Sequence, residues 1–205
     1  MSDSTRFNNR INPRFQVDGR VLYDSRSVAV TAIVLAYDAG VGSFRALVGE
    51  RGEAVDHSGK WCLCCGYLDW DESLQEAVRR EVFEEAGLDL RALEAAGDAV
   101  VAPEPIFLQS DPAAHRQNVT ARFVIELCRL VEPSTANAEP GEVVQLKWIQ
   151  VTHAEIAERP WAFHHDEILG ELATFFEREK NDGSLDAGST RRFYRAMLER
   201  RYPFA

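Results

Sequence analysis

Long hydrophobic runs are missing from this chain of 205 residues. A membrane-spanning helix needs roughly 20 consecutive apolar residues, and the longest candidate, Val28–Tyr37, is much shorter and includes Thr31. The first residues, MSDSTRFNNR, lack the apolar core of a secretory signal. We therefore expect a cytoplasmic protein with no membrane partner.

Cysteine is also scarce. The chain has 4 cysteines, and three of them, Cys62, Cys64 and Cys65, are too close together to build a disulfide framework in a chain of this size. We interpret them as reduced thiols in a strand. The alternative is a structural zinc site, but it lacks a second pair at zinc spacing, because only the distant Cys128 and the nearby His57 are available.

Positive charge is in deficit. Lys and Arg total 23 against 33 Asp and Glu, so the formal net charge is −10. Such a surface repels a phosphate backbone, and we expect no nucleic-acid partner. An acidic protein can still bind a small phosphorylated ligand when it recruits a divalent metal ion.

Apolar segments predict more strands than helices. Strands are expected over Val28–Tyr37, 44–49, 61–68, 119–131 and 143–151, with a short or edge strand within 99–108. Further helices are expected near 154–157, over 166–180, and from a capping Ser189 to about Arg201. This mixture predicts an α/β fold with a mixed sheet. Residues 1–20 are expected to form a flexible N-terminal arm, and residues 21–205 a single domain.

The segment from Ser73 to Gly87 carries the strongest helix signal. Ser73 and Glu76 have the spacing of a capping box, and Gly87 is well placed to end the helix. Both ends of this helix are therefore specified by local sequence.

Three carboxylates of this helix lie on or beside its apolar side. At about 100° per residue, Glu81 and Glu85 point in nearly the same direction as the apolar stripe, with Glu84 beside them. A solvated charged face is the usual interpretation of such a run, but it does not explain this placement. Buried carboxylates repel one another and lose hydration, and hard divalent cations with oxygen ligands offset both costs at neutral pH. Arg80 is expected to pair with acidic neighbours such as Glu84.

The same residues match a known pattern. Gly66, Glu72 and the run from Arg80 to Leu88 resemble the Nudix box at every defined position. Many members begin the box with Pro-Gly-Gly, where this chain has Cys64-Cys65-Gly66. The resemblance implies a Nudix fold, an α/β/α sandwich around a mixed sheet. It also implies a hydrolase that cleaves a nucleoside diphosphate linked to another group.

The resemblance assigns roles to the box residues. Glu81, Glu84 and Glu85, joined by the carbonyl of Cys65, are similar to ligands of Mg²⁺ or Mn²⁺ in this family. The residues that would brace the box and orient the carboxylates are Gly66, Glu72, Arg80 and Gly87.

The chemistry needs a base and contacts for the substrate. Metal ions neutralise a diphosphate and lower the pKa of bound water, and a carboxylate then accepts the proton. Candidates for that base are the three helix glutamates and Glu142, which is also explained as an ordinary polar residue at a strand end. Possible substrate contacts, each also explained as a solvated surface residue, are Arg45, Arg51, Lys60 and Arg116.

Several functions compete. Pro103 and Pro105 lie about where ADP-ribose-cleaving members carry a marker proline, so an ADP-ribose-like substrate is favoured over NADH, dinucleoside polyphosphates or nucleoside triphosphates. A non-catalytic metabolite sensor on the same fold is the main alternative, and the intact glutamate set argues against it. An RNA-end hydrolase conflicts with the net charge. An isomerase of a prenyl diphosphate needs a Cys and Glu pair in the pocket, which the sequence does not place. Many relatives are dimers, so a homodimer is possible, with the N-terminal arm as the swapping element.

Overall fold

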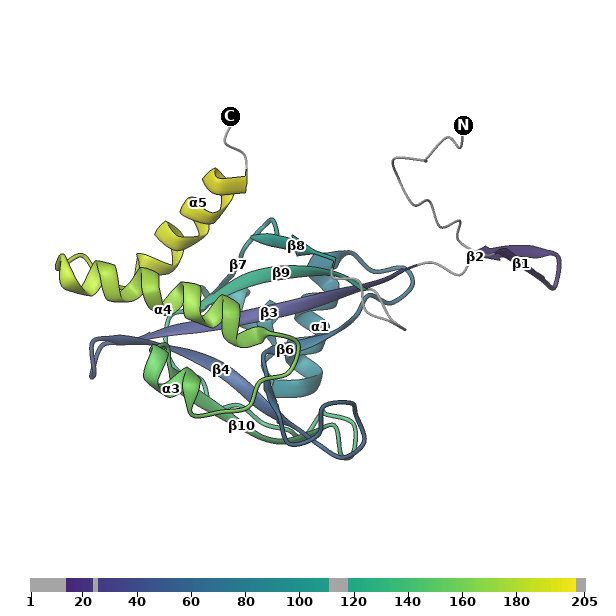
Figure 1. Cartoon of the computed structure of the whole chain (residues 1–205), viewed down its shortest axis with the longest axis horizontal. Coiled ribbons are helices and arrows are strands. Elements are labelled where there is room, and N and C mark those ends of the chain that lie inside the picture. Colours follow the sequence, from purple (N-terminus) through teal and green to yellow (C-terminus); the bar gives the residue numbers. More distant parts are fainter. Residues whose placement is uncertain (1–13, 24–25, 111–117, 202–205) are drawn as a thin grey trace, which may run out of the picture.

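The computed structural model describes residues 14–23, 26–110 and 118–201 (Figure 1). Of the helices within these ranges, none is long and apolar enough to cross a membrane.

A mixed sheet of eight strands forms the centre of the molecule. The strands are β3 (Ser27–Asp38), β4 (Ser43–Arg51), β5 (Trp61–Cys62), β6 (Cys64–Tyr67), β7 (Ala99–Val101), β8 (Phe107–Gln109), β9 (Asn118–Leu127) and β10 (Val143–Gln150). The main path runs β10–β4–β3–β9–β7, while β5, β6 and β8 pair with β4, β3 and β9. β3 and β9 are parallel, and the other pairs are antiparallel. The predicted mixed sheet is confirmed.

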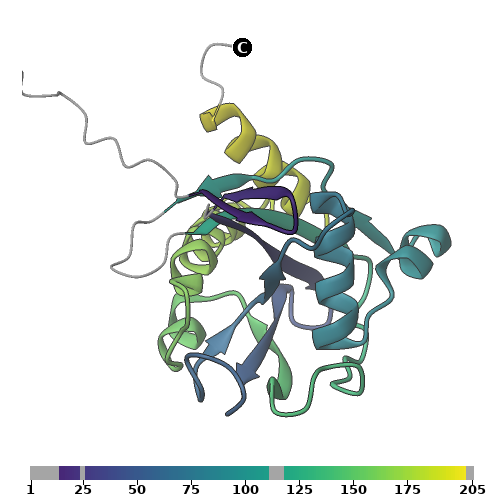
Figure 2. The same cartoon turned by 90° about the vertical axis from the view of Figure 1, so that its right-hand side faces the viewer.

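Within the described residues, five helices cover the two faces of this sheet. They are α1 (Leu74–Ala86), α2 (Leu90–Ala96), α3 (His153–Ala157), α4 (His165–Asn181) and α5 (Ser189–Arg201). Residues of α1 pack with Val30, Ala32 and Val34 of β3, whereas residues of α4 pack with Ile33 and Leu35 of the same strand. The alternation of side chains along a strand thus feeds two separate cores. Figure 2 shows α1 and α4 on opposite sides of the sheet, which confirms the α/β/α sandwich.

The caps of α1 are as predicted. The Ser73 hydroxyl accepts the backbone N–H of Glu76 at 3.2 Å, and the Glu76 carboxylate accepts the backbone N–H of Ser73 at 2.8 Å. Gly87 ends the helix with φ of +68°, in the left-handed region that favours glycine. Local sequence therefore fixes the helix that carries the acidic cluster.

The last residues of the predicted N-terminal arm, which was expected to end at residue 20, belong to a regular element. β1 (Arg14–Val17) and β2 (Arg20–Tyr23) form an antiparallel hairpin that is separate from the main sheet. Asp18 and Gly19 make its two-residue turn with φ of +49° and +76°. An Asp-Gly pair favours this turn because both positions need positive φ. Residues 1–13 lie outside the described residues.

Three other details differ from the sequence prediction. The strand expected to reach residue 131 ends at Leu127, because its antiparallel neighbour β7 begins opposite that residue, at Ala99. The short helix α2 was not predicted, although Asp89 caps its start and Gly97 its end. Ser189 is the first residue of α5 rather than its cap, since its hydroxyl accepts the backbone N–H of Asp186 at 3.1 Å.

Candidate active site

Two glutamates of α1 are buried against the sheet. Glu81 is 6% exposed and Glu85 4% exposed, while Glu84 is half-buried. The inward placement predicted from helical periodicity is confirmed. Burial raises the pKa of Glu81 to about 7 and raises the pKa of Glu85 well above its ordinary value, and neighbouring acidic groups add to both shifts. Both carboxyls therefore need a proton or a cation.

The backbone of β6 contacts both of these acids. A Cβ atom at Gly66 would overlap the carboxylate of Glu81, so glycine is needed for this close approach. The backbone N–H of Cys65 donates to Oε2 of Glu85 at 3.1 Å. The predicted supporting role of Gly66 therefore has a direct steric cause.

Arg80 links the box loop to the helix. Its Nη1 donates to Oε1 of Glu81 at 2.7 Å and to Oε2 of Glu84 at 2.9 Å. Its Nη2 donates to Oε1 of Glu72 at 2.7 Å and to the carbonyl oxygen of Tyr67 at 2.8 Å. The hydrogen bond from Arg80 holds the pKa of Glu72 below its ordinary value. This is the bracing geometry that the sequence implied for Glu72 and Arg80.

The donor set suits a hard divalent cation, but the side chains do not converge as they stand. Within the described residues, no three His, Cys, Asp or Glu groups are arranged to hold an ion. Arg80 engages Glu81 and Glu84, and the Cys65 backbone engages Glu85. The oxygen donors nevertheless include two buried carboxyls that would be stabilised in their charged form by a divalent ion. The residues therefore fit such a group once Arg80 releases one carboxylate.

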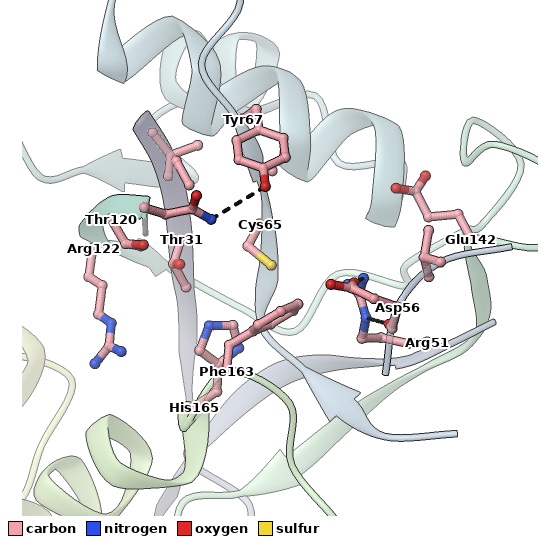
Figure 3. A pocket seen from close by; sticks show the side chains of 15 residues that line it. Thr31, Arg51, Asp56, Cys65, Tyr67, Thr120, Arg122, Glu142, Phe163 and His165 are labelled. Atoms are coloured by element: carbon pink, nitrogen blue, oxygen red, sulfur yellow. Dashed lines mark hydrogen bonds and ion pairs between the residues drawn. The ribbon is translucent and has the colours of Figure 1, made fainter. Parts of the chain in front are cut away.

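A cavity of about 370 Å³ opens beside β6 (Figure 3). Glu142 lies at one end of it, and the Sγ atom of Cys65 points into it. The charge of Glu142 contributes to the raised pKa of both Glu81 and Glu85, so it lies within electrostatic range of the helix acids. Cys65, Gly66 and Glu142 therefore line the cavity, whereas Glu81, Glu84 and Glu85 are not among its lining residues and meet it only through the backbone of β6.

The four predicted substrate contacts have different outcomes. Arg51 lines the cavity, is 8% exposed, and its Nη2 lies 2.6 Å from Oδ1 of Asp56. Arg45 pairs with Asp38 at 2.8 Å and lies opposite Ala36 of β3, about 17 Å along the strand from the cavity residues 29–31.

Lys60 is not among the residues that line the cavity either. The proposed contact of Arg45 and Lys60 with a substrate therefore has no support from the cavity lining and stays a prediction. Arg116 lies outside the described residues.

The cavity is also lined by residues that were not among the predicted site residues. Arg122 of β9 is 6% exposed, His165 of α4 is 2% exposed, and both line the cavity together with Phe163. A charged residue inside an apolar strand was the available signal for Arg122. For His165, the interpretation as an ordinary residue at a helix start was preferred to a functional one, and it is the first residue of α4.

The cysteine cluster consists of free thiols, as predicted. Cys62 and Cys64 are buried, and Cys65 is half-buried at the cavity. Cys64 belongs to the core on the α1 side of the sheet. Among the described residues nothing forms a zinc cluster.

Comparison with known proteins agrees with this geometry. A family model described as the NUDIX domain matches residues 26–172. An isopentenyl-diphosphate Δ-isomerase from Clavibacter michiganensis subsp. michiganensis is 31% identical over 142 residues, which are 65% of this chain and 67% of the relative.

Two solved structures share the fold. The NUDIX domain of Shewanella oneidensis NrtR, complexed with ADP ribose, is 19% identical with a TM-score of 0.57, covering 72% of this chain and 86% of that one. A bifunctional NMN adenylyltransferase/ADP ribose pyrophosphatase from Francisella tularensis, complexed with AMP and a Mn ion, is 22% identical with a TM-score of 0.53, covering 72% of this chain and 41% of that one. The chain therefore belongs to the NUDIX family.

Proposed function

We propose that this protein hydrolyses the diphosphate bond of a nucleoside diphosphate linked to another moiety, with an ADP-ribose-like substrate favoured. The observation that carries the proposal is the pair of buried carboxyls, Glu81 and Glu85, held by β6 beside a cavity of about 370 Å³. Mg²⁺ is the proposed cofactor, with Mn²⁺ as the alternative.

The residues divide into a metal side and a base. Glu81, Glu84, Glu85 and the carbonyl of Cys65 would hold the divalent ion. When bound, the ion supplies charge neutralisation and lowers the pKa of a coordinated water. Glu142 is the proposed base, because it lines the cavity and is close enough to the helix acids to influence their pKa values. Arg51, buried at the cavity wall, is the proposed phosphate contact.

The neighbouring structures support the ligand class. The Shewanella domain is complexed with ADP ribose, and the Francisella protein with AMP and a Mn ion. At 19% and 22% identity these structures share the fold of this chain, so an assay has to identify its substrate.

A substrate panel tests the proposal. Purified protein is incubated with Mg²⁺ or Mn²⁺ and ADP-ribose, NADH, dinucleoside polyphosphates, nucleotide sugars or nucleoside triphosphates, and the products are separated by chromatography. We expect metal-dependent release of a nucleoside monophosphate from ADP-ribose or a related compound. Tight binding of a metabolite without any product would identify a sensor instead.

A specific observation favours a second candidate, the isomerisation of a prenyl diphosphate. That reaction needs a Cys and a Glu in one pocket, and Cys65 and Glu142 both line the cavity. The isomerase from Clavibacter is the curated relative reported above. Incubation with isopentenyl diphosphate and analysis of the double-bond position tests it. A Cys65→Ser variant would lose isomerisation but keep diphosphate hydrolysis.

A homodimer and a cytoplasmic location stay predictions. Phe15, Val17 and Leu22 are exposed on one face of the β1–β2 hairpin, and a lone two-stranded hairpin is marginally stable in water. We propose that a second copy of the chain covers this face. Light scattering after size-exclusion chromatography would give the dimer mass, and Phe15→Ser would shift the protein towards the monomer. A wild-type monomer at micromolar concentration contradicts the proposal.

A further inference from the structure

Two adjacent residues between α3 and α4 have a strained backbone. Phe163 and His164 adopt φ of +56° and +55°, in the left-handed region where an aromatic side chain is rarely found. Such strain persists only where the surrounding structure holds it, and it is concentrated at functional sites. Phe163 lines the cavity, whereas His164 is exposed. The conformation therefore points to a role for the Phe163 side chain.

Hydrogen bonds hold the backbone on both sides of this turn. The backbone N–H of Trp61 donates to the carbonyl oxygen of Pro160 at 2.8 Å, and that of Ala162 donates to the carbonyl oxygen of Trp61 at 2.9 Å. Residues 160–162 are thus attached to β5. His165 is already the first residue of α4, and its N–H donates to the carbonyl oxygen of Ala162 at 3.1 Å. The change of direction falls on the two residues between them, and it places the Phe163 ring in the cavity (Figure 3).

The Phe163 ring packs on the guanidinium of Arg51. The Cζ atom of Arg51 lies 4.8 Å from the ring centroid, which is within the range of a cation–π interaction. The imidazole of His57 packs against the same ring, with the centroids 4.9 Å apart and the planes nearly perpendicular. The guanidinium therefore rests on an aromatic surface whose own position is fixed.

Hydrogen bonds hold the edges of the Arg51 guanidinium. Its Nε donates to the carbonyl oxygen of Asp56 at 2.7 Å, its Nη2 to Oδ1 of Asp56 at 2.6 Å, and its Nη1 to Sγ of Cys62 at 4.0 Å. A guanidinium has five N–H groups, so two of them have no partner among the described residues. Because Arg51 is buried and lines the cavity, these two donors can serve the oxygens of a phosphoryl group.

We propose that Phe163 is a positioning residue for Arg51. Its ring fixes the plane of the guanidinium, so that the two remaining donors are directed to the diphosphate of the substrate, and the strained turn is retained because it places the ring there. This inference rests on the proposed function, in which Arg51 contacts a phosphoryl group. A ring that acts through Arg51 matters to binding only while the arginine is present.

Binding of methylenediphosphonate tests this role without turnover. This diphosphate analogue has no base to stack on the ring and no hydrolysable bridge, so its affinity in Mg²⁺, measured by calorimetry, reports the phosphoryl contacts alone. We expect affinity to fall about fivefold in Phe163→Leu and roughly 30-fold in Arg51→Gln. Phe163→Tyr, which keeps an aromatic face, should restore most of the affinity that Phe163→Leu loses. Absence of binding in the wild type, or equal affinity in wild type and Phe163→Leu, overturns the proposal.

The double variant separates positioning from direct contact. In the Arg51→Gln background, Phe163→Leu should have no further effect, because the guanidinium that the ring orients is absent. An undiminished effect in that background would show that the ring contacts the ligand itself, which overturns the positioning role. Phe175→Leu is the matched control, because Phe175 lies 4.9 Å from the guanidinium of Arg178 and does not line the cavity. Its affinity should equal that of the wild type.

A second pair of variants tests the strained turn. Phe163→Ala and Phe163→Gly both remove the ring, but only glycine adopts positive φ without strain. We expect both to bind the analogue as weakly as Phe163→Leu, while Phe163→Gly melts about 2–4 °C higher than Phe163→Ala in thermal denaturation followed by circular dichroism. A Phe163→Gly variant that melts below Phe163→Ala overturns the claim that the turn is kept for the ring.

The failure of this inference differs from the failure of the proposed function. Hydrolysis of an ADP-ribose-like substrate, with independent effects of Phe163→Leu and Arg51→Gln, would refute the positioning role and leave the proposed function intact. Coupled effects on binding of the analogue, without hydrolysis of any compound in the substrate panel, would refute the proposed function and leave the positioning of Arg51 intact.

Discussion

The two ends of the cavity are assembled from different kinds of chain segment. The buried acids of α1 and the strand that contacts them come from one stretch, residues 65–85, in which β6, a loop and α1 follow one another, and Cys65, Gly66 and Tyr67 of this stretch line the cavity. The opposite wall of the cavity includes Arg122 of β9 and His165 at the start of α4. The hydrogen bond that holds His165 joins residues 102 positions apart, Leu63 and His165. Local signals can specify the first end, whereas the second exists only after strands and helices have packed.

Burial also has different effects on the ionisable groups of these two regions. Burial of Glu81 and Glu85 favours their protonated form, which a bound cation would replace by the charged form. On the opposite wall, burial of His165 favours a neutral imidazole, fixed by a backbone N–H. The buried carboxyls therefore need a proton or a bound cation, whereas the neutral imidazole of His165 needs no opposite charge.

The largest expected effect comes from replacing one of the buried acids of α1. Glu85→Gln removes one proposed metal ligand while keeping the size of the side chain. Because even residues that only orient ligands cost about 10- to 100-fold when changed, we expect the Mg²⁺-dependent rate to fall by more than about a hundredfold. Circular dichroism should show an unchanged fold. A variant with the normal rate and normal metal dependence would disprove the helix-metal proposal.

Glu81 and His165 are expected to give opposite pH dependences of the free energy of unfolding. The pKa of Glu81 is raised to about 7, so the unfolded chain loses this proton first and stability in EDTA falls as pH rises from about 4.5 to 7. The pKa of His165 is lowered to about 3, so the unfolded chain binds a proton first and stability falls as pH drops from about 6.5 to 3. In the wild type these two contributions oppose each other between about pH 4.5 and 6.5.

Variants should expose the two slopes separately. Over that range, we expect the pH slope of the free energy of unfolding, measured by urea titration in EDTA, to be more positive in Glu81→Gln and more negative in His165→Asn than in the wild type, with the falling contribution of Glu85 common to all three proteins. Each slope is at most about 1.4 kcal/mol per pH unit for one proton. Identical pH profiles for wild type and both variants would contradict the assignment of these shifts.

A smaller effect tests how β6 holds the buried acids of α1. A Cβ at Gly66 would meet only the flexible tip of Glu81, so Gly66→Ala should shift that carboxylate without unfolding the protein. We expect metal affinity to fall by roughly 10-fold with little change in the melting temperature. Gly97→Ala is a useful comparison, because a Cβ there meets nothing within 4 Å, although its φ of +77° still costs some stability. If Gly66→Ala binds metal normally, the close approach of Glu81 has no functional role.

Sequence-based prediction succeeded where a single element carries the information. The capping box, the terminal glycine and the 3.6-residue period placed Glu81 and Glu85 on the buried face of α1 before any contact was known. It also identified the strands over 28–37 and 44–49 and the order of the later helices. It failed for the hairpin at Arg14–Tyr23, although the Asp18-Gly19 turn was readable in the sequence.

Prediction of the substrate contacts was less accurate because it required knowledge of strand pairing. Arg45 and Arg51 lie on the same strand, yet one is paired with Asp38 near the β3–β4 turn and the other faces the cavity. Nothing in the residues around Arg122 says that its strand lies parallel to β3 and brings it beside His165.

By itself, the sequence determined the helix, its caps and the inward direction of its acids, because these depend on neighbours within about four residues. Tertiary structure alone decided which arginines line the cavity and which nitrogen of His165 accepts the N–H of Leu63. Those properties depend on register between distant strands and on one backbone donor, and no local periodicity encodes either.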